Sequence, residues 1–148
     1  MTWTFPRRDR RPGRQEPPAD RLDPDAVEEN LPLVIQGRPA ESLEEARVAV
    51  ALEIMGWRFV YQQSYFGGTD VPGGLRIDFL VLTPVTATPL LVQSRYWHTV
   101  RDRRNLDLFQ RTRLAAIPNL AEPIEVWDYE LQTLQQSIRT LTKVLGRP

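Results

Sequence analysis

The chain has 148 residues and a formal net charge of zero, with 41% hydrophobic and 26% charged residues, as expected for one globular domain. The absence of cysteine excludes disulfides and thiolate zinc sites, and the single histidine excludes a site built from several histidines. No apolar run approaches the roughly 18 residues of a membrane span, and the N-terminal arginines are followed by no apolar stretch of the kind that secretory signals have. We therefore expect a cytoplasmic or virion protein that is not secreted and does not bind a membrane.

Residues 1–31 are rich in proline and segregated in charge, with arginines first and acidic residues after them. Such a segment cannot bury enough apolar surface to offset its ordering entropy, so we expect an extended N-terminal arm followed by a globular domain over 32–148. We expect the arm to bind protein subunits of an assembly, and DNA is the alternative because basic arms commonly contact nucleic acid. The arm residues expected to bind the partner are Trp3, Phe5, Arg7, Arg8, Arg10 and Arg11.

The globular pattern begins with a short apolar run at 32–35, which predicts an edge strand. Ser42 and Glu45 have the spacing of a capping box, and the helix after them ends at Gly56. Alternation predicts a strand over 57–65, followed by a glycine- and proline-rich loop. Further elements are a strand at 75–82, a turn at 84–89, a strand at 90–96, a helix at 99–116, a strand at 122–129 and a helix at 131–145.

The order α-β-β-β-α-β-α predicts an α/β (α+β) fold in which helices flank a single mixed sheet. The first three strands are expected to form a meander. The strand after the second helix is expected to pair in parallel with its neighbour, through a crossover connection.

Asp78 lies in one apolar strand, and the next strand ends in Gln93-Ser94-Arg95-Tyr96-Trp97-His98. This arrangement resembles the PD-(D/E)XK restriction-endonuclease-like fold over roughly residues 42–145. More narrowly, 96–98 and 125–131 are similar to segments of very-short-patch repair endonucleases, including small phage-encoded relatives.

The resemblance implies that Asp78 is a catalytic carboxylate and a metal ligand, that Glu45 supports the metal or its water, and that His98 is a general acid or base. It also implies nucleic-acid contacts by Tyr96 and Trp97, while an arginine-rich stretch is a candidate phosphate-binding face. The arginines of that face are Arg101, Arg103, Arg104, Arg111 and Arg113. The chain departs from the family because Gln93 replaces an acidic residue, and Arg95, which cannot act as a base, replaces a lysine.

Structural interpretations remain open beside these roles. Glu45 is explained by helix capping, Asp78 by an ion pair with Arg76 or Arg95, and His98 by a structural role at a strand end. Trp97 and Trp127 are typical of core or interface aromatics, and the arginines are interrupted by acidic residues.

The departures favour a catalytically degenerate endonuclease fold that serves as a structural or adaptor subunit, and the family likeness suggests a phage virion. On this hypothesis the chain is not an enzyme and needs no cofactor. One alternative is a Mg²⁺-dependent DNA endonuclease that uses Asp78, Glu45 and His98. A second alternative is a non-catalytic DNA-binding module, whose affinity would fall steeply with salt.

Overall fold

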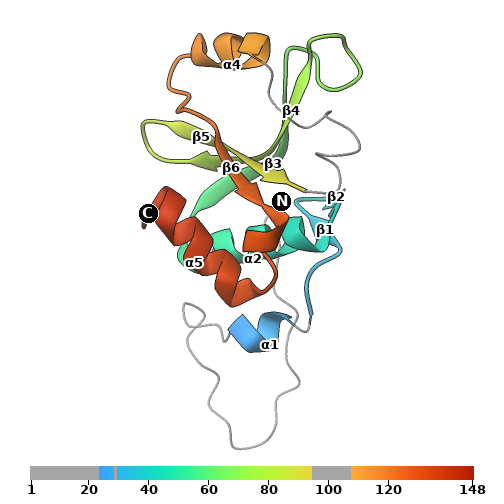
Figure 1. Ribbon diagram of the computed structural model, residues 1–148, viewed down its shortest axis with the longest axis vertical. Helices are drawn as coiled ribbons and strands as arrows, with labels where there is room; N and C mark the ends of the chain where they lie inside the picture. Colours follow the sequence, from blue (N-terminus) through green and yellow to red (C-terminus); the bar gives the residue numbers. More distant parts are fainter. Residues whose placement is uncertain (1–23, 29, 95–107) are drawn as a thin grey trace, which may run out of the picture.

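The computed structural model describes residues 24–28, 30–94 and 108–148 and contains a four-stranded mixed sheet (Figure 1). Its strands lie in the order β3 (Arg58–Tyr65), β4 (Leu75–Leu82), β5 (Ala87–Gln93) and β6 (Ile124–Trp127). The first three are antiparallel neighbours, whereas β6 runs parallel to β5 after a connection that contains α4 (Leu108–Ala115). The predicted mixed α+β class, meander and parallel last strand are thus confirmed.

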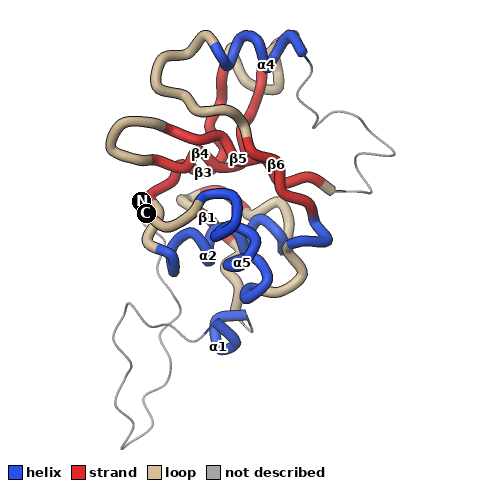
Figure 2. Tube along the Cα trace, turned by 60° about the vertical axis from the view of Figure 1, so that its left-hand side comes forward, coloured by secondary structure: helices blue, strands red, loops and turns tan. Residues whose placement is uncertain are grey.

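Helices cover both faces of this sheet. The helices α2 (Leu43–Met55) and α5 (Leu134–Leu145) lie against one face of the sheet (Figure 2) and bury the larger apolar cluster, which includes Phe79. On the other face, Leu114 of α4 completes a smaller cluster with residues of β4 and β5. The sheet is therefore the middle layer, as predicted, and it brings α2 close to the centre of β4.

The strand β4 changes the face to which its apolar side chains point at one level. Phe79 and Val81 of β4 belong to the larger cluster, whereas Ile77 and Leu75 belong to the smaller one on the opposite face. The register of β3 and β4 is the same on both sides of this point, but the opposed pair formed by Gln62 and Asp78 is missing from the ladder. Gln62 has a φ of 58° and interrupts the alternation, so Asp78 occupies an irregular position in a buried strand.

A small hairpin covers the outer edge of β3. It consists of β1 (Val34–Ile35) and β2 (Arg38–Pro39), joined at Gln36 and Gly37, which both have positive φ, as in a type I′ turn. The Gln36 side chain acts as a short substitute strand, since its Nε2 donates to Phe59 O at 2.8 Å and its Oε1 accepts from Tyr61 N at 2.7 Å. An edge strand otherwise presents unpaired backbone groups, which this amide satisfies.

We expect Gln36→Met to lower the free energy of unfolding by about 2 kcal/mol, because it removes two hydrogen bonds and leaves backbone groups of β3 without these partners. Methionine matches glutamine in length and, like glutamine, would have to adopt the positive φ of this position, so the turn itself is little changed. Urea denaturation measures the effect. The control is Gln63→Met, whose amide makes only an exposed contact with Ser64 O; equal losses in the two variants would contradict the edge-capping role.

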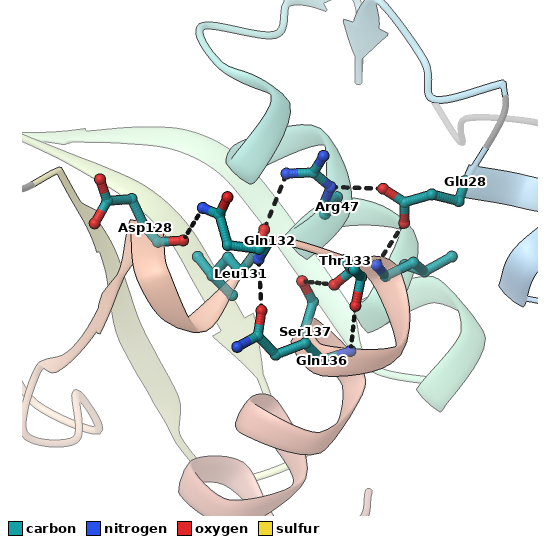
Figure 3. Close-up of polar contacts among 9 residues, drawn as sticks. Glu28, Arg47, Asp128, Leu131, Gln132, Thr133, Gln136 and Ser137 are labelled. Atoms are coloured by element: carbon teal, nitrogen blue, oxygen red, sulfur yellow. Dashed lines mark hydrogen bonds and ion pairs between the residues drawn. The ribbon is translucent and has the colours of Figure 1, made fainter.

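A short helix, α1 (Pro24–Glu28), packs against α5, although the sequence analysis assigns this stretch to an extended arm. Val27 is buried in the larger cluster, and the Glu28 carboxylate accepts from Arg47 Nε at 2.7 Å and from the backbone N–H of Leu134 (Figure 3). Arg47 also donates to Leu131 O at 3.0 Å. These contacts join α1, α2 and the start of α5, so an apolar anchor and a helix-capping carboxylate offset the cost of ordering this segment.

Several boundaries differ from those predicted. β5 begins at Ala87 and includes Pro89, because Thr83 and Thr86 form the hairpin turn with one another. β6 is shorter than predicted, since a 3₁₀ turn, η1 (Asp128–Glu130), follows it. α5 begins at Leu134, because the Thr133 hydroxyl caps it by accepting from Gln136 N at 3.0 Å. The strand predicted at 32–35 is present at Val34–Ile35, where it pairs with β2 in a second, two-stranded sheet and does not join the main sheet.

Within the described ranges, no helix combines the length and the apolar character needed to cross a membrane.

Candidate metal centre

Three carboxylates from different elements meet beside the irregular level of β4. Glu41 precedes α2, Glu45 lies in its first turn, and Asp78 comes from the middle of β4. One carboxylate oxygen from each residue lies within 4.8 Å of those of the other two. Glu45 and Asp78 are two of the site residues predicted from the sequence, and the structure places them together.

Helix capping positions Glu45 at the start of α2, but it does not account for the burial of the Glu45 carboxylate. The Ser42 hydroxyl accepts from Glu45 N at 3.1 Å, which confirms the predicted cap. The Glu45 side chain is 0% exposed, and its carboxylate accepts from Ser42 Oγ at 3.1 Å and from Tyr61 Oη at 3.1 Å. Capping accounts for the hydroxyl of Ser42, but it does not require a buried carboxylate beside Asp78.

The environment of Glu45 opposes its ionisation. Burial, followed by the nearby charges of Asp78 and Glu41, raises the pKa of Glu45 to about 7. The hydrogen bonds from Tyr61 and Ser42 act in the opposite direction but do not compensate. Without a cation, full ionisation of this cluster therefore costs free energy at neutral pH.

The Tyr61 hydroxyl connects the two glutamates. It donates to Glu45 Oε1 and accepts from Glu41 N at 3.3 Å, so it fixes the start of α2 against β3. Burial and the neighbouring Glu45 carboxylate raise the pKa of Tyr61, which therefore stays protonated and remains a donor. Its ring packs against Phe79, with centroids 5.1 Å apart.

Asp78 also shapes the sheet around it. Its Oδ2 accepts from Val92 N at 2.8 Å, and the regular pairing between β4 and β5 ends at Phe79 and Leu90. The carboxylate thus takes the place of a backbone acceptor where the two strands stop pairing. Asp78 is 7% exposed, so its charge lies in a largely desolvated position.

Glu41 is exposed and pairs with Arg76, which lies two residues before Asp78 on β4. This contact corrects one of the structural expectations, because Arg76 forms its ion pair with Glu41, at the edge of the cluster. Arg95, the other partner expected for Asp78, lies outside the described residues.

The donor set fits a hard divalent cation. Mg²⁺ and Mn²⁺ prefer oxygen ligands and are commonly held by carboxylates together with water and substrate phosphate. Three carboxylate oxygens from two rigid elements and one short connection provide such ligands. A bound cation would also offset the burial of Glu45 and its repulsion by Asp78 and Glu41, which together raise its pKa.

Gln93 is buried at the end of β5, where it is in register with Trp127 of β6. Trp127 stacks on Tyr129 with an interplanar angle of 19°, in agreement with a packed rather than isolated aromatic side chain.

The remaining predicted site residues lie outside the described residues: Arg95, Tyr96, Trp97, His98, Arg101, Arg103, Arg104, and the arm residues Trp3, Phe5, Arg7, Arg8, Arg10 and Arg11.

Two arginines of the candidate phosphate-binding face contact protein groups. Arg111 forms an ion pair with Glu125 at 2.9 Å. The Arg113 guanidinium lies 3.6 Å from the centroid of the Phe66 ring and donates to Gly73 O at 3.0 Å. Both side chains fasten α4 to its neighbours, which weakens the interpretation of these two residues as a phosphate-binding face.

Glu41 and Tyr61 are site residues that were not predicted from the sequence. Glu41 lies four residues before Glu45 and next to the N-cap Ser42, a spacing that brings two side chains to one side of a helix start. That signal was available in the sequence. Tyr61 had no such signal, because its position beside Glu45 depends on how α2 packs on β3.

The chain matches no protein-family model, no curated protein and no solved structure with which it was compared.

Proposed function

We propose that this chain is a metal-dependent endonuclease acting on DNA, with Glu41, Glu45 and Asp78 as the ligands of Mg²⁺ or Mn²⁺. The observation that supports the proposal is the convergence of three carboxylates on one point, two of them buried. Buried carboxylates are costly unless a partner compensates their charge, and clusters with perturbed pKa values are concentrated at functional sites.

The protein groups have separate tasks in this proposal. Asp78 and Glu45 supply charge from rigid elements, and the Tyr61 and Val92 hydrogen bonds hold those carboxylates in place. When bound, the cation would supply Lewis acidity toward a phosphodiester. Because ligands bind in the ionised form, cation binding near neutral pH is expected to release the proton that Glu45 carries in part of the molecules.

The choice of DNA as substrate rests on the resemblance to PD-(D/E)XK nucleases, and hence on the position of Asp78 before the cluster that ends in Tyr96-Trp97-His98. That part of the proposal is an inference by analogy, whereas the cation site is argued from the carboxylates themselves.

Cleavage of plasmid and mismatched duplex DNA in Mg²⁺ or Mn²⁺ tests the proposal. We expect wild type to cut and Asp78→Asn to lose at least about 100-fold in rate, because the variant removes one charge from the ligand set. Asparagine keeps an oxygen that can accept from Val92 N, so the sheet is preserved. Cutting that needs no cation, or that survives in Asp78→Asn, would contradict the proposed roles.

The second candidate is the catalytically degenerate structural or adaptor subunit. It is favoured by Gln93, a neutral and buried amide where the family pattern has an acidic residue, and by Arg76, which already neutralises Glu41. In this case wild type would fail to cut DNA under every metal condition. Deletion of 1–23 would then be expected to disrupt a defined assembly while the folded body, including α1, remains stable.

A further inference from the structure

Arg76 is a basic side chain that contacts the carboxylate cluster, through Glu41. Its Nη2 donates to Glu41 Oε1, and both side chains are about 30% exposed. The contact therefore lies at the mouth of the site, between the buried carboxylates and solvent. An exposed ion pair of this kind contributes little to stability, so its main effect is on the charge balance of the carboxylate cluster.

We propose that Arg76 is an internal counter-ion that limits cation affinity, and that it transfers from Glu41 to a substrate phosphate when a divalent cation binds. This inference rests on the proposed function. Glu41 cannot serve the cation fully while it is paired with a guanidinium. A guanidinium also has five N–H donors in a planar array, which suits phosphate as well as carboxylate.

Two opposing effects follow from this exchange. Without Arg76, the cluster has one positive charge fewer, so a cation should bind more tightly. Without Arg76, a DNA phosphate at this cation also lacks the guanidinium as a hydrogen-bond donor, so DNA should bind more weakly. A merely structural role for Arg76 predicts neither a gain in cation affinity nor this pair of opposite signs.

The variant that tests the inference is Arg76→Gln, with Arg76→Lys as the conservative form that keeps the charge. The matched control is Arg58→Gln, an exposed arginine at the opposite end of the β3–β4 pair, because Arg58 pairs with Leu82 and Arg76 with Ser64. Six strand positions separate the two sites, or roughly 20 Å. The control changes the net charge equally but leaves the cluster intact.

Mn²⁺ affinity is measured by calorimetry, and DNA affinity by fluorescence anisotropy of a short duplex in Ca²⁺, which uses the same hard oxygen ligands. We expect Arg76→Gln to bind Mn²⁺ about three- to tenfold more tightly than wild type, with Arg58→Gln unchanged. DNA binding should weaken, and the slope of log affinity against log salt should fall by about one. Arg76→Lys should resemble wild type in Mn²⁺ affinity.

The outcomes separate the inference from the proposed function. If wild type binds Mn²⁺ but Arg76→Gln gains no affinity, or gains no more than Arg58→Gln, the counter-ion role is overturned and the metal site stands. If Mn²⁺ affinity rises and DNA affinity is unchanged, the transfer to phosphate is overturned. If wild type binds no Mn²⁺, the proposed function fails and the inference fails with it.

Discussion

Replacing Glu45 with glutamine is expected to stabilise the cation-free protein at pH 8 relative to wild type by about 2–3 kcal/mol, and to have a much smaller effect at pH 5. The pKa of Glu45 is raised from 4.5 to about 7 in the folded protein, so the folded state binds more protons than the unfolded state between these values. Wild-type stability therefore falls as pH rises through this window. Glutamine has no charge to bury and avoids the loss.

Urea denaturation at several pH values, in the presence of a chelator, measures the difference between the two proteins. Glu44→Gln is the control, since it removes a charge from the same helix turn but lies outside the carboxylate cluster. Added Mn²⁺ should reverse the order at pH 8 by stabilising wild type more than Glu45→Gln. A stability difference that is the same at pH 5 and pH 8 would mean that Glu45 is not the strained carboxylate.

Gly74→Ala is expected to lower the free energy of unfolding by about 3 kcal/mol or more. A Cβ at this position would lie 1.7 Å from Gly68 O and 2.9 Å from Val71 O, and both are backbone atoms that cannot rotate away. The loop that contains these residues is held by hydrogen bonds from Gly68 N to Tyr65 O and from Gly74 N to Val71 O. Relief of the clash would therefore require the loop to open.

The same loop accepts hydrogen bonds from α4, so the Gly74→Ala substitution should also destabilise that helix. Gln110 and Arg113 of α4 donate to Gly74 O and Gly73 O, at 3.4 and 3.0 Å. Asp70→Ala, at an exposed position of the loop, is the control and should change stability by less than about 0.5 kcal/mol. Chemical denaturation followed by circular dichroism compares them; a Gly74→Ala protein as stable as the control would show that the loop is loosely held.

The sequence predicted the elements whose signals are local. The Ser42 cap, the Gly56 stop and the apolar run of β4 each depend on neighbouring residues, and the structure has all three. The start of β5 was missed because the two threonines at 83 and 86 form a tight turn that composition alone does not reveal. The helix α1 was missed because its order depends on contacts with α5, more than a hundred residues away in the chain.

The candidate site was only partly predicted, because some of its residues have local sequence signals and others are brought together by packing between distant segments. Asp78 stood out because a carboxylate inside an apolar strand is unusual, and the structure adds that it accepts from Val92 N. The sequence favours helix capping as the explanation of Glu45, whereas its burial and its contact with Tyr61 depend on tertiary packing. The grouping of Glu41 with them follows from the packing of α2 on β3, which no single stretch of sequence encodes.

Mn²⁺ binding measured by calorimetry at pH 7.5 shows whether the three carboxylates bind a divalent cation. Wild type should bind one Mn²⁺, Asp78→Asn and Glu45→Gln should each weaken binding at least about tenfold, and Glu44→Gln should bind as wild type does. Absence of binding in wild type, or binding that is unaffected by both substitutions in the cluster, would show that these carboxylates are not cation ligands and would favour the adaptor function.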